Sequence, residues 1–269
     1  RFAHDGQWRL LDGDKMAALL ASFFREQLAR AGLLDAQPPA ADALSMAVVQ
    51  TAYANGAATA FLRARGVPIA IARTGVKYLH HAALEFDLGI YFEANGHGTA
   101  LFSERLLERL TAVANGQAAS DSTAAAAART LLAAHRLINQ AVGDALSDLL
   151  VIDCVLRRLG WDTATWDAMY EDLPSRQTKL PVADRALVVC SEDEASVVSP
   201  PALKAELERL MAATPSGRCF ARPSGTEDVV RIYAEAETQA LADALALDAA
   251  RAVHALAEGV GDAPTAFSA

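Results

Sequence analysis

The sequence has little cysteine and no long apolar run, and both shortages limit what the protein can be. Its three cysteines, Cys154, Cys190 and Cys219, are odd in number and widely spaced, so they fit neither a disulfide framework nor a zinc motif. This usage favours a reducing compartment, and we expect a cytoplasmic protein. No apolar stretch reaches the roughly 18 residues that a membrane-spanning helix needs, so we expect no membrane partner.

Positive charge is scarce as well. The chain has 24 Lys and Arg against 33 Asp and Glu, a net charge of −9, which argues against a nucleic-acid binder. An anionic ligand would therefore need a local positive pocket within an acidic protein. Because 52% of the residues are hydrophobic and 21% are charged, we expect a globular chain, and its 269 residues suffice for two domains.

The first 92 residues alternate between short apolar segments and helical segments. We expect strands at 46–53, 67–72 and 88–92, and helices at 13–30, 55–65 and 74–86. This alternation predicts α/β units with a largely parallel sheet. Asp12-Gly13-Asp14 resembles a metal loop, but an amphipathic helix begins there, so helix capping explains both carboxylates.

Residues 99 to about 160 have a mostly helical pattern. The sequence pattern stops being mostly helical between Pro174 and Pro181, and we expect a linker between residues 173 and 182. Beyond it the pattern predicts a smaller α+β unit. Its expected strands lie at 187–190, 218–221 and 229–235, and its expected helices at 201–211 and 239–257.

The segment Arg222-Pro223-Ser224-Gly225-Thr226-Glu227-Asp228 concentrates phosphate-binding chemistry, and Arg231 follows closely. Arginine offers a planar fork of donors that matches phosphate oxygens. Ser224 and Thr226 add rotatable hydroxyl donors, and Gly225 lets backbone N–H groups approach an anion. The same residues also suit an ordinary solvated turn, so both interpretations stay open at this point.

A second polar cluster, Glu93-Ala94-Asn95-Gly96-His97-Gly98-Thr99, is expected between a strand and a helix. Ligands collect at the carboxyl ends of parallel strands, and Glu93 and Asn95 could bind sugar hydroxyls there. A glycine-rich turn whose Asn95 caps the helix is the alternative. Lys77, in the first turn of the expected helix 74–86, could face the same crevice or be a solvated lysine. One carboxylate and one histidine are too few for a metal site, so we assign no metal ligands.

Five motifs occur in an order that points to one enzyme family. They are Thr51-Ala52-Tyr53-Ala54-Asn55-Gly56, Thr74-Gly75-Val76-Lys77, Phe92 to Thr99, Asp172-Leu173-Pro174-Ser175-Arg176-Gln177, and Arg222 to Asp228. Together they resemble the phosphoacetylglucosamine mutases of the α-D-phosphohexomutase superfamily, over essentially the whole chain. Five ordered motifs are far more specific than any one of them.

The resemblance implies a fold and a division into domains. Members of the superfamily have four domains around a central cleft. By resemblance, residues 1–65 are the remainder of domain 2, residues 66–175 are domain 3, and residues 176–269 are the carboxy-terminal domain 4. The implied fold class is α/β: a remnant of one α/β domain, a complete α/β domain and a smaller α+β domain.

The resemblance also implies site residues and a reaction. The implied substrate-binding residues are Glu93, Ala94 and Asn95 in a sugar loop, and Arg222, Pro223, Ser224, Gly225, Thr226 and Arg231 in a phosphate loop. The reaction is the interconversion of N-acetylglucosamine 6-phosphate and 1-phosphate in the synthesis of UDP-N-acetylglucosamine, so the partner is a small sugar phosphate. Lys77 is a further candidate, as a cleft cation or proton shuttle, and no other catalytic residue is assigned.

The chain departs from the family pattern in two places. It has neither a phosphoserine loop of the Ser-His-Asn-Pro type nor an Asp-Gly-Asp-Ala-Asp magnesium loop. We therefore expect Mg²⁺ as the cofactor with ligands upstream of residue 1, and no turnover from this segment alone, because phosphoryl transfer needs a nucleophile and a cation. The alternatives are a non-catalytic sugar-phosphate binding protein and a phosphoglucomutase or phosphomannomutase.

Overall fold

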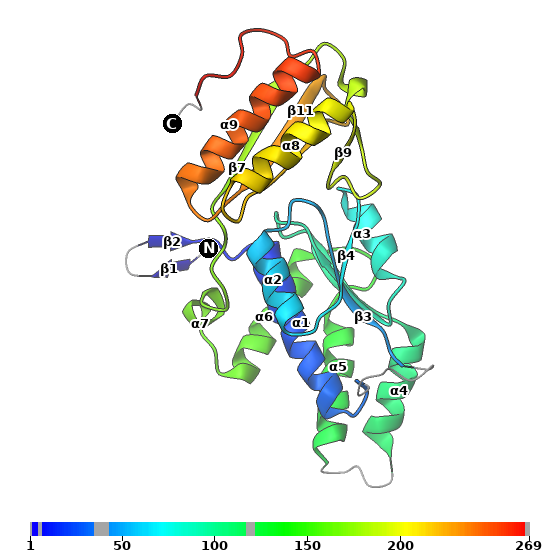
Figure 1. Ribbon diagram of the computed structural model, residues 1–269. Coiled ribbons are helices and arrows are strands. Elements are labelled where there is room, and N and C mark those ends of the chain that lie inside the picture. Colours follow the sequence, from blue (N-terminus) through cyan, green and yellow to red (C-terminus); the bar gives the residue numbers. More distant parts are fainter. Residues whose placement is uncertain (1, 5–6, 35–42, 117–121, 267–269) are drawn as a thin grey trace. The chain divides into compact units, whose positions relative to one another are not determined.

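The computed structural model describes residues 2–4, 7–34, 43–116 and 122–266, and Figure 1 shows their helices and strands. The chain divides into two compact units. The first consists of Arg1–Gln50 and Ala58–Glu171, and the second of Thr51–Ala57 and Asp172–Ala269. Helices and strands alternate through both units, which confirms the expected mixed α/β class.

The first unit is built on a four-stranded sheet with the order β4-β3-β5-β6. Its strands are β3 (Met46–Gln50), β4 (Ile69–Ile71), β5 (Leu88–Phe92) and β6 (Gly98–Phe102). β3 pairs in parallel with β4 and β5, as predicted, whereas β6 runs antiparallel to β5. The strand expected at 67–72 is confirmed as the shorter β4, which is an edge strand, so that Ile69 and Ala70 are partly exposed and Ile71 is 38% exposed.

The prediction that residues 99 to about 160 are mostly helical was wrong at its beginning, because Gly98–Phe102 form the strand β6. The turn between β5 and β6 is tight, since the Glu93 N–H donates to the His97 carbonyl at 3.0 Å and Gly96 has a φ of 88°. A positive φ suits glycine, which has no Cβ to clash. This turn sends the chain straight back along β5, so Gly98–Phe102 pairs as a strand before the first helix begins at Glu104.

Helices cover both faces of this sheet. The described helices of the first unit and its neighbouring segments are α1 (Gly13–Arg30), α2 (Gly56–Ala64), α3 (Val76–Ala83), α4 (Glu104–Asn115), α5 (Thr123–Leu137), α6 (Ala145–Leu159) and α7 (Thr163–Asp167), with a short hairpin of β1 (Phe2–His4) and β2 (Gln7–Arg9). Asp12 caps α1 by accepting from the Lys15 N–H at 3.0 Å, which confirms capping.

The sheet residues alternate between two cores with the period of two that a strand imposes. Val48 and Ile90 belong to a large core with α1, α4, α5 and α6, and Val49 and Tyr91 belong to a smaller core with α3. Phe24 of α1 shares the larger core with Ile90. The division expected after residue 65 therefore falls inside this unit, because residues from both sides of it pack together.

The second unit has a three-stranded antiparallel sheet with the order β10-β11-β7. Its elements are β7 (Ser175–Pro181), the 3-10 turn η1 (Arg185–Leu187), β8 (Val189–Cys190), β9 (Val197–Ser199), α8 (Pro201–Ala213), β10 (Arg218–Pro223), β11 (Val229–Glu235) and α9 (Gln239–Leu256). The linker expected at 173–182 is instead the edge strand β7. The mostly polar sequence of β7 gave no strand signal, because Leu180 is the one residue of this strand that is buried.

Different segments pack on the two faces of this sheet. α8 and α9 lie side by side on one face (Figure 1), where Leu207 and Ala249 pack against residues such as Ile232. The segment Thr51–Ala57 contacts the other face, since Tyr53 packs edge-on against Phe220 and Tyr233.

Polar contacts hold Thr51–Ala57 in the second unit. Arg218 donates to the carbonyls of Ala52 and Ala54 at 2.8 and 2.7 Å. Glu235, only 1% exposed, accepts from the Gly56 N–H at 3.0 Å and from Arg218 Nε at 2.7 Å. The segment Thr51–Ala57, which includes the first two residues of α2, thus belongs structurally with residues 172–266.

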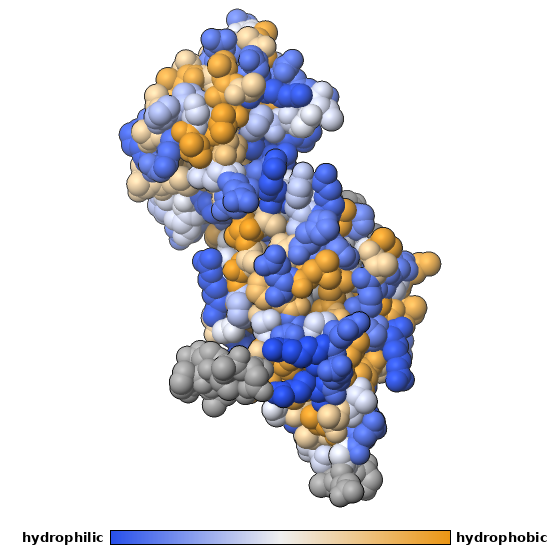
Figure 2. Space-filling view, turned by 90° about the vertical axis from the view of Figure 1, so that its right-hand side faces the viewer, coloured by the Kyte–Doolittle hydropathy of each residue, from blue (hydrophilic) through white to orange (hydrophobic). Residues whose placement is uncertain are grey.

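Apolar side chains also reach the surface at scattered positions. Figure 2 shows hydrophobic and hydrophilic residues interspersed over the visible face of each unit. On α6, Leu146, Leu149 and Leu150 are more than half exposed. No helix among the described residues is long and apolar enough to cross a membrane.

We predict that Arg218→Ala destabilises the second unit by about 3 kcal/mol, because it leaves the buried Glu235 carboxylate without its cation. Urea unfolding followed by circular dichroism measures the change. Arg209→Ala is the matched control, since Arg209 is exposed and pairs on the surface of α8 with Glu206, and it should change stability by less than about 0.5 kcal/mol. Equal losses in the two variants would contradict the prediction.

Candidate functional site

Arg222 and Arg231 lie directly opposite each other on β10 and β11. Opposite residues of an antiparallel pair present their side chains on the same face, with Cβ atoms about 5 Å apart. Lys179 of β7 lies opposite Arg231 in turn, so three strands place three positive side chains in one row on one face. Like charges in such a row repel, and an anion bound among them would relieve the repulsion.

The turn that joins β10 to β11 begins directly beside this row. Ser224 is buried and its N–H donates to the Val229 carbonyl at 2.9 Å, whereas Gly225 to Asp228 are exposed. A Cβ at Gly225 would meet no atom within 4 Å, and φ there is not positive. The fold itself therefore does not require glycine at 225.

The acidic residues of the turn have positive neighbours. Glu227 lies 3.9 Å from Lys179 Nζ, and Asp228 lies 3.9 Å from Arg185 Nε. Both are exposed contacts with little effect on stability. They reduce the negative potential that Glu227 and Asp228 would otherwise add beside Arg222 and Arg231.

Two residues outside the predicted site, Tyr53 and Glu194, lie beside Arg222. The Arg222 guanidinium carbon lies 5.9 Å from the centroid of the Tyr53 ring, and Glu194 Oε2 lies 3.3 Å from Arg222 Nε. Burial raises the pKa of Tyr53, and the charges of Arg222 and Arg231 oppose that rise. Tyr53 stood within a quoted motif without an assigned role, and no sequence signal marked Glu194.

The second polar cluster forms the turn between β5 and β6, and not the strand-to-helix connection that was expected. Asn95 stabilises the turn, because its Oδ1 accepts from the His97 N–H at 2.8 Å, and its amide lies 3.4 Å from Glu93 Oε2. Asn95 therefore caps no helix. Ala94 and Asn95 are exposed and Glu93 is partly exposed, so the polar groups of the turn are accessible.

The N-terminus of α1 packs tightly against this turn. The Gly13 N–H donates to the Ala94 carbonyl at 3.3 Å, and a Cβ on Gly13 would lie only 1.8 Å from the Glu93 carbonyl oxygen. Glycine is therefore required at position 13 by backbone contact. The contact fixes Glu93 and Ala94 relative to the body of the first unit.

Lys77 lines a cavity of about 300 Å³ next to the same turn. Its other lining residues are Val76, His80, His81, Tyr91, His97, Ala141, Val142 and Gly143. His80 Nδ1 lies 3.0 Å from the Tyr91 hydroxyl. Burial raises the pKa of Tyr91 to about 12, with a further contribution from Asp148. The structure thus brings Lys77 together with His97 of the turn, in a cavity with several nitrogen donors.

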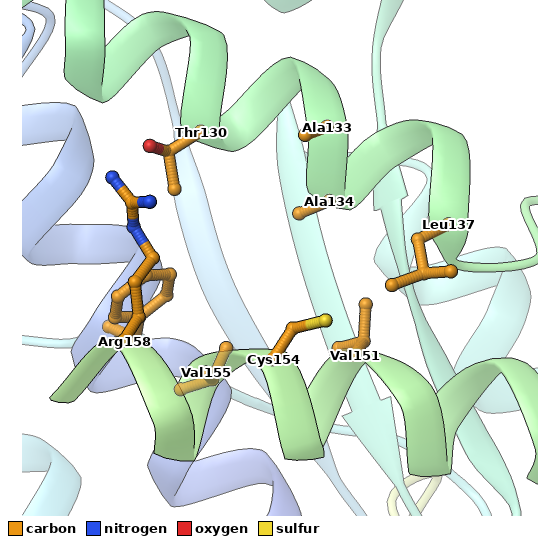
Figure 3. Close-up of a pocket in the computed structure, with 9 residues that line it drawn as sticks. Thr130, Ala133, Ala134, Leu137, Val151, Cys154, Val155 and Arg158 are labelled. Carbon is orange, nitrogen blue, oxygen red and sulfur yellow. The ribbon is translucent and has the colours of Figure 1, made fainter. Parts of the chain in front are cut away.

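A second cavity, of about 180 Å³, lies between α5 and α6. Figure 3 shows Thr130 and Leu137 of α5 facing Val151, Cys154 and Arg158 of α6. Its walls are mostly apolar and carry no carboxylate or imidazole. This cavity lacks the hydrogen-bonding groups that recognise a sugar, so we do not place the site here.

The predicted site residues thus fall into two groups. Glu93, Ala94, Asn95 and Lys77 belong to the first unit, and Arg222 to Thr226 with Arg231 belong to the second. Among the described residues there is no group of three or more His, Cys, Asp or Glu side chains able to hold a metal ion.

Comparison with known proteins places these units in families. Residues 179–252 match the model of the phosphoglucomutase/phosphomannomutase C-terminal domain. Residues 12–161 match the model described as phosphoacetylglucosamine mutase AMG1, domain III. The chain belongs to the phosphoacetylglucosamine mutase family.

Similar proteins from an animal, a plant and a fungus support this family membership. The chain is 46% identical to phosphoacetylglucosamine mutase of Mus musculus over 261 residues, covering 97% of this chain and 46% of that protein. It is 48% identical to phosphoacetylglucosamine mutase of Arabidopsis thaliana, covering 91% of this chain and 44% of that protein. The crystal structure of Aspergillus fumigatus N-acetylphosphoglucosamine mutase with GlcNAc-6P and magnesium superposes with a TM-score of 0.83 at 44% identity, covering 92% of this chain and 48% of that chain. The chain thus spans just under half the length of each relative.

The buried carboxyl group of Asp148 makes the free energy of unfolding depend on pH. It is 2% exposed, its Oδ1 makes no hydrogen bond, and burial, with Asp144, raises its pKa to about 7. The native state therefore binds a proton that the unfolded state loses near its ordinary pKa of about 4, so the free energy of unfolding falls as pH rises from about 4 to 7.

We predict that Asp148→Asn makes this pH dependence shallower and stabilises the protein above pH 7 by about 1–2 kcal/mol. Thermal unfolding at a series of pH values measures both effects. Asp153→Asn is the control, because Asp153 is exposed on the same helix and pairs with Arg157. An unchanged pH profile in Asp148→Asn would contradict the prediction.

Proposed function

We propose that this chain supplies the sugar-binding and phosphate-binding loops of a phosphoacetylglucosamine mutase, which interconverts N-acetylglucosamine 6-phosphate and N-acetylglucosamine 1-phosphate. The observation that carries the proposal is the row of Arg222, Arg231 and Lys179 beside the Ser224–Asp228 turn. Membership of the family supports it, as does the GlcNAc-6P bound in the structure of the fungal relative.

In the second unit, Arg222 and Arg231 neutralise the phosphate that is not transferred. Their planar guanidinium groups donate in pairs to its oxygens. The Ser224 and Thr226 hydroxyls and the backbone N–H groups around Gly225 orient the same phosphate. Pro223, at the end of β10, fixes the direction in which the chain enters the turn.

In the first unit, the turn after β5 recognises the sugar. Glu93 accepts hydrogen bonds from two sugar hydroxyls, and Asn95 donates and accepts beside it, on a turn that Gly13 and Gly96 keep rigid. Ala94 leaves space for the sugar ring. Lys77 is a cation for the same ligand, because it shares a cavity with His97 of this turn.

Magnesium enters the proposal through the relatives. The fungal structure contains GlcNAc-6P and magnesium. In the whole enzyme the ion would stabilise the charge that develops on a phosphoryl group during transfer. We propose that residues outside the described part of this chain bind it, so the roles of Glu93, Asn95, Arg222 and Arg231 are binding and orientation.

We predict that Arg222→Gln weakens binding of N-acetylglucosamine 6-phosphate to the chain about 10- to 100-fold, because hydrogen bonds between charged groups are worth about 1.5–3 kcal/mol. Arg222→Lys should also weaken binding, since lysine cannot donate in a planar fork. Isothermal titration calorimetry measures the dissociation constants.

Arg209→Gln is the matched control for this measurement. It removes one positive charge from the same unit, but Arg209 pairs with Glu206 on α8 and lies in no proposed site. Equal affinity of the parent chain and Arg222→Gln would refute the phosphate site.

A further inference from the structure

Glu194 places a carboxylate against the phosphate-loop arginine. Its Oε2 lies 3.3 Å from Arg222 Nε, and the two side chains are only 15% and 14% exposed. Glu194 belongs to the turn between β8 and β9, in which the Glu194 N–H donates to the Ser191 carbonyl at 2.9 Å. A mostly buried carboxylate beside an arginine of the proposed phosphate site requires a reason, because it opposes an anionic ligand.

The backbone at Glu194 gives no reason for glutamate there. Its φ is 57°, in the left-handed region that favours glycine and is uncommon for residues with a long side chain. The turn is closed independently of this side chain, since the Ser191 N–H donates to the Ser196 carbonyl at 2.9 Å. The fold alone would therefore be served by glycine, and the contact with Arg222 distinguishes glutamate.

The Nε of Arg222 is close to Glu194 but poorly aligned with it. Arg222 Nε is buried and makes no hydrogen bond, although a carboxylate oxygen lies 3.3 Å away. In the same sheet, Arg218 Nε donates to Glu235 at 2.7 Å, which shows what a well-aligned pair looks like in this unit. The Nε donor of Arg222 is therefore open to a better-placed acceptor, such as a phosphate oxygen.

The local charges define what such an acceptor must overcome. A phosphate ester carries a charge of about −1.5 to −2 at pH 7. Arg222 and Arg231 together match that charge, whereas the Glu194 carboxylate adds a further negative charge in contact with one of them. Phosphate binding therefore has to displace the carboxylate or bind against its repulsion.

We propose that Glu194 is a tethered counter-anion of the phosphate site, which neutralises Arg222 in the free protein and lowers the affinity of the site for phosphate esters. The inference rests on the proposed phosphate site and names the residue that sets its strength. In a reversible reaction whose substrate and product both carry a phosphate, a lower affinity for that phosphate allows the product to dissociate. Glu194 acts through Arg222, so it is a residue that tunes binding and not a catalytic residue.

The test compares Glu194→Gln with the parent chain by calorimetric titration, with inorganic phosphate and with N-acetylglucosamine 6-phosphate as separate probes. Glutamine keeps the size of the side chain and removes its charge. We expect the dissociation constants of both probes to fall about five- to tenfold, and the rise in Tm caused by phosphate to grow accordingly. If Glu194→Gln folds poorly, Glu194→Asp, which shortens the side chain by one methylene, should tighten binding in the same direction.

Glu192→Gln is the matched control. Glu192 is an exposed glutamate in the same turn, so this variant makes the same change in net charge. Tighter binding in Glu194→Gln alone supports the proposal. Unchanged or weaker binding in Glu194→Gln, or an equal gain in Glu192→Gln, overturns it while leaving the phosphate site intact. No binding of either probe by any of these proteins overturns the phosphate site and this inference together.

Discussion

The buried carboxylate of Glu235 holds together the part of the second unit on which the proposed phosphate site depends. It accepts from Arg218, from the Tyr233 hydroxyl and from the Gly56 N–H. Arg218 in turn donates to the carbonyls of Ala52 and Ala54. Segment 51–57 therefore cannot leave the sheet without exposing or stranding a buried charge, which is strongly unfavourable. This constraint keeps Tyr53 beside Arg222.

The two ends of one face of the β10–β11 hairpin consequently carry different side chains. At one end, Arg218 and Glu235 form a neutral anchor, and the aromatic rings of Phe220 and Tyr233 follow along the strands. At the other end, the positions opposite Arg231 on both neighbouring strands are the positive residues Arg222 and Lys179, and the carboxylate that faces Arg222 comes from Glu194, outside these three strands. Strand register alone creates this gradient, because residues two apart share a face. The proposed anion site in this acidic chain depends on that register.

The first unit prepares its turn by a different means. Its rigidity comes from close backbone packing, where Gly13 allows α1 to approach the Glu93 carbonyl and Gly96 allows the tight return into β6. A side chain at Gly13 would separate the helix from the turn. The residues of the proposed site are thus held by close backbone packing or strand pairing in both units, and a binding site for a small, polar ligand requires such rigid support.

The sequence by itself determined what depends on neighbouring residues: the Asp12 cap of α1, the Arg222–Asp228 turn, the mixed α/β class and the family resemblance. Hydrogen bonds within a few residues decide caps and turns, so their signals survive in a short window. Only the tertiary structure decided that β6 and β7 are strands, that segment 51–57 belongs to the second unit, and that Lys179, Tyr53 and Glu194 surround the arginines. These features depend on strand pairing and on contacts between residues that are not neighbours in the sequence, such as Tyr53 and Arg222, and no local pattern records which partner a strand or a charge will find.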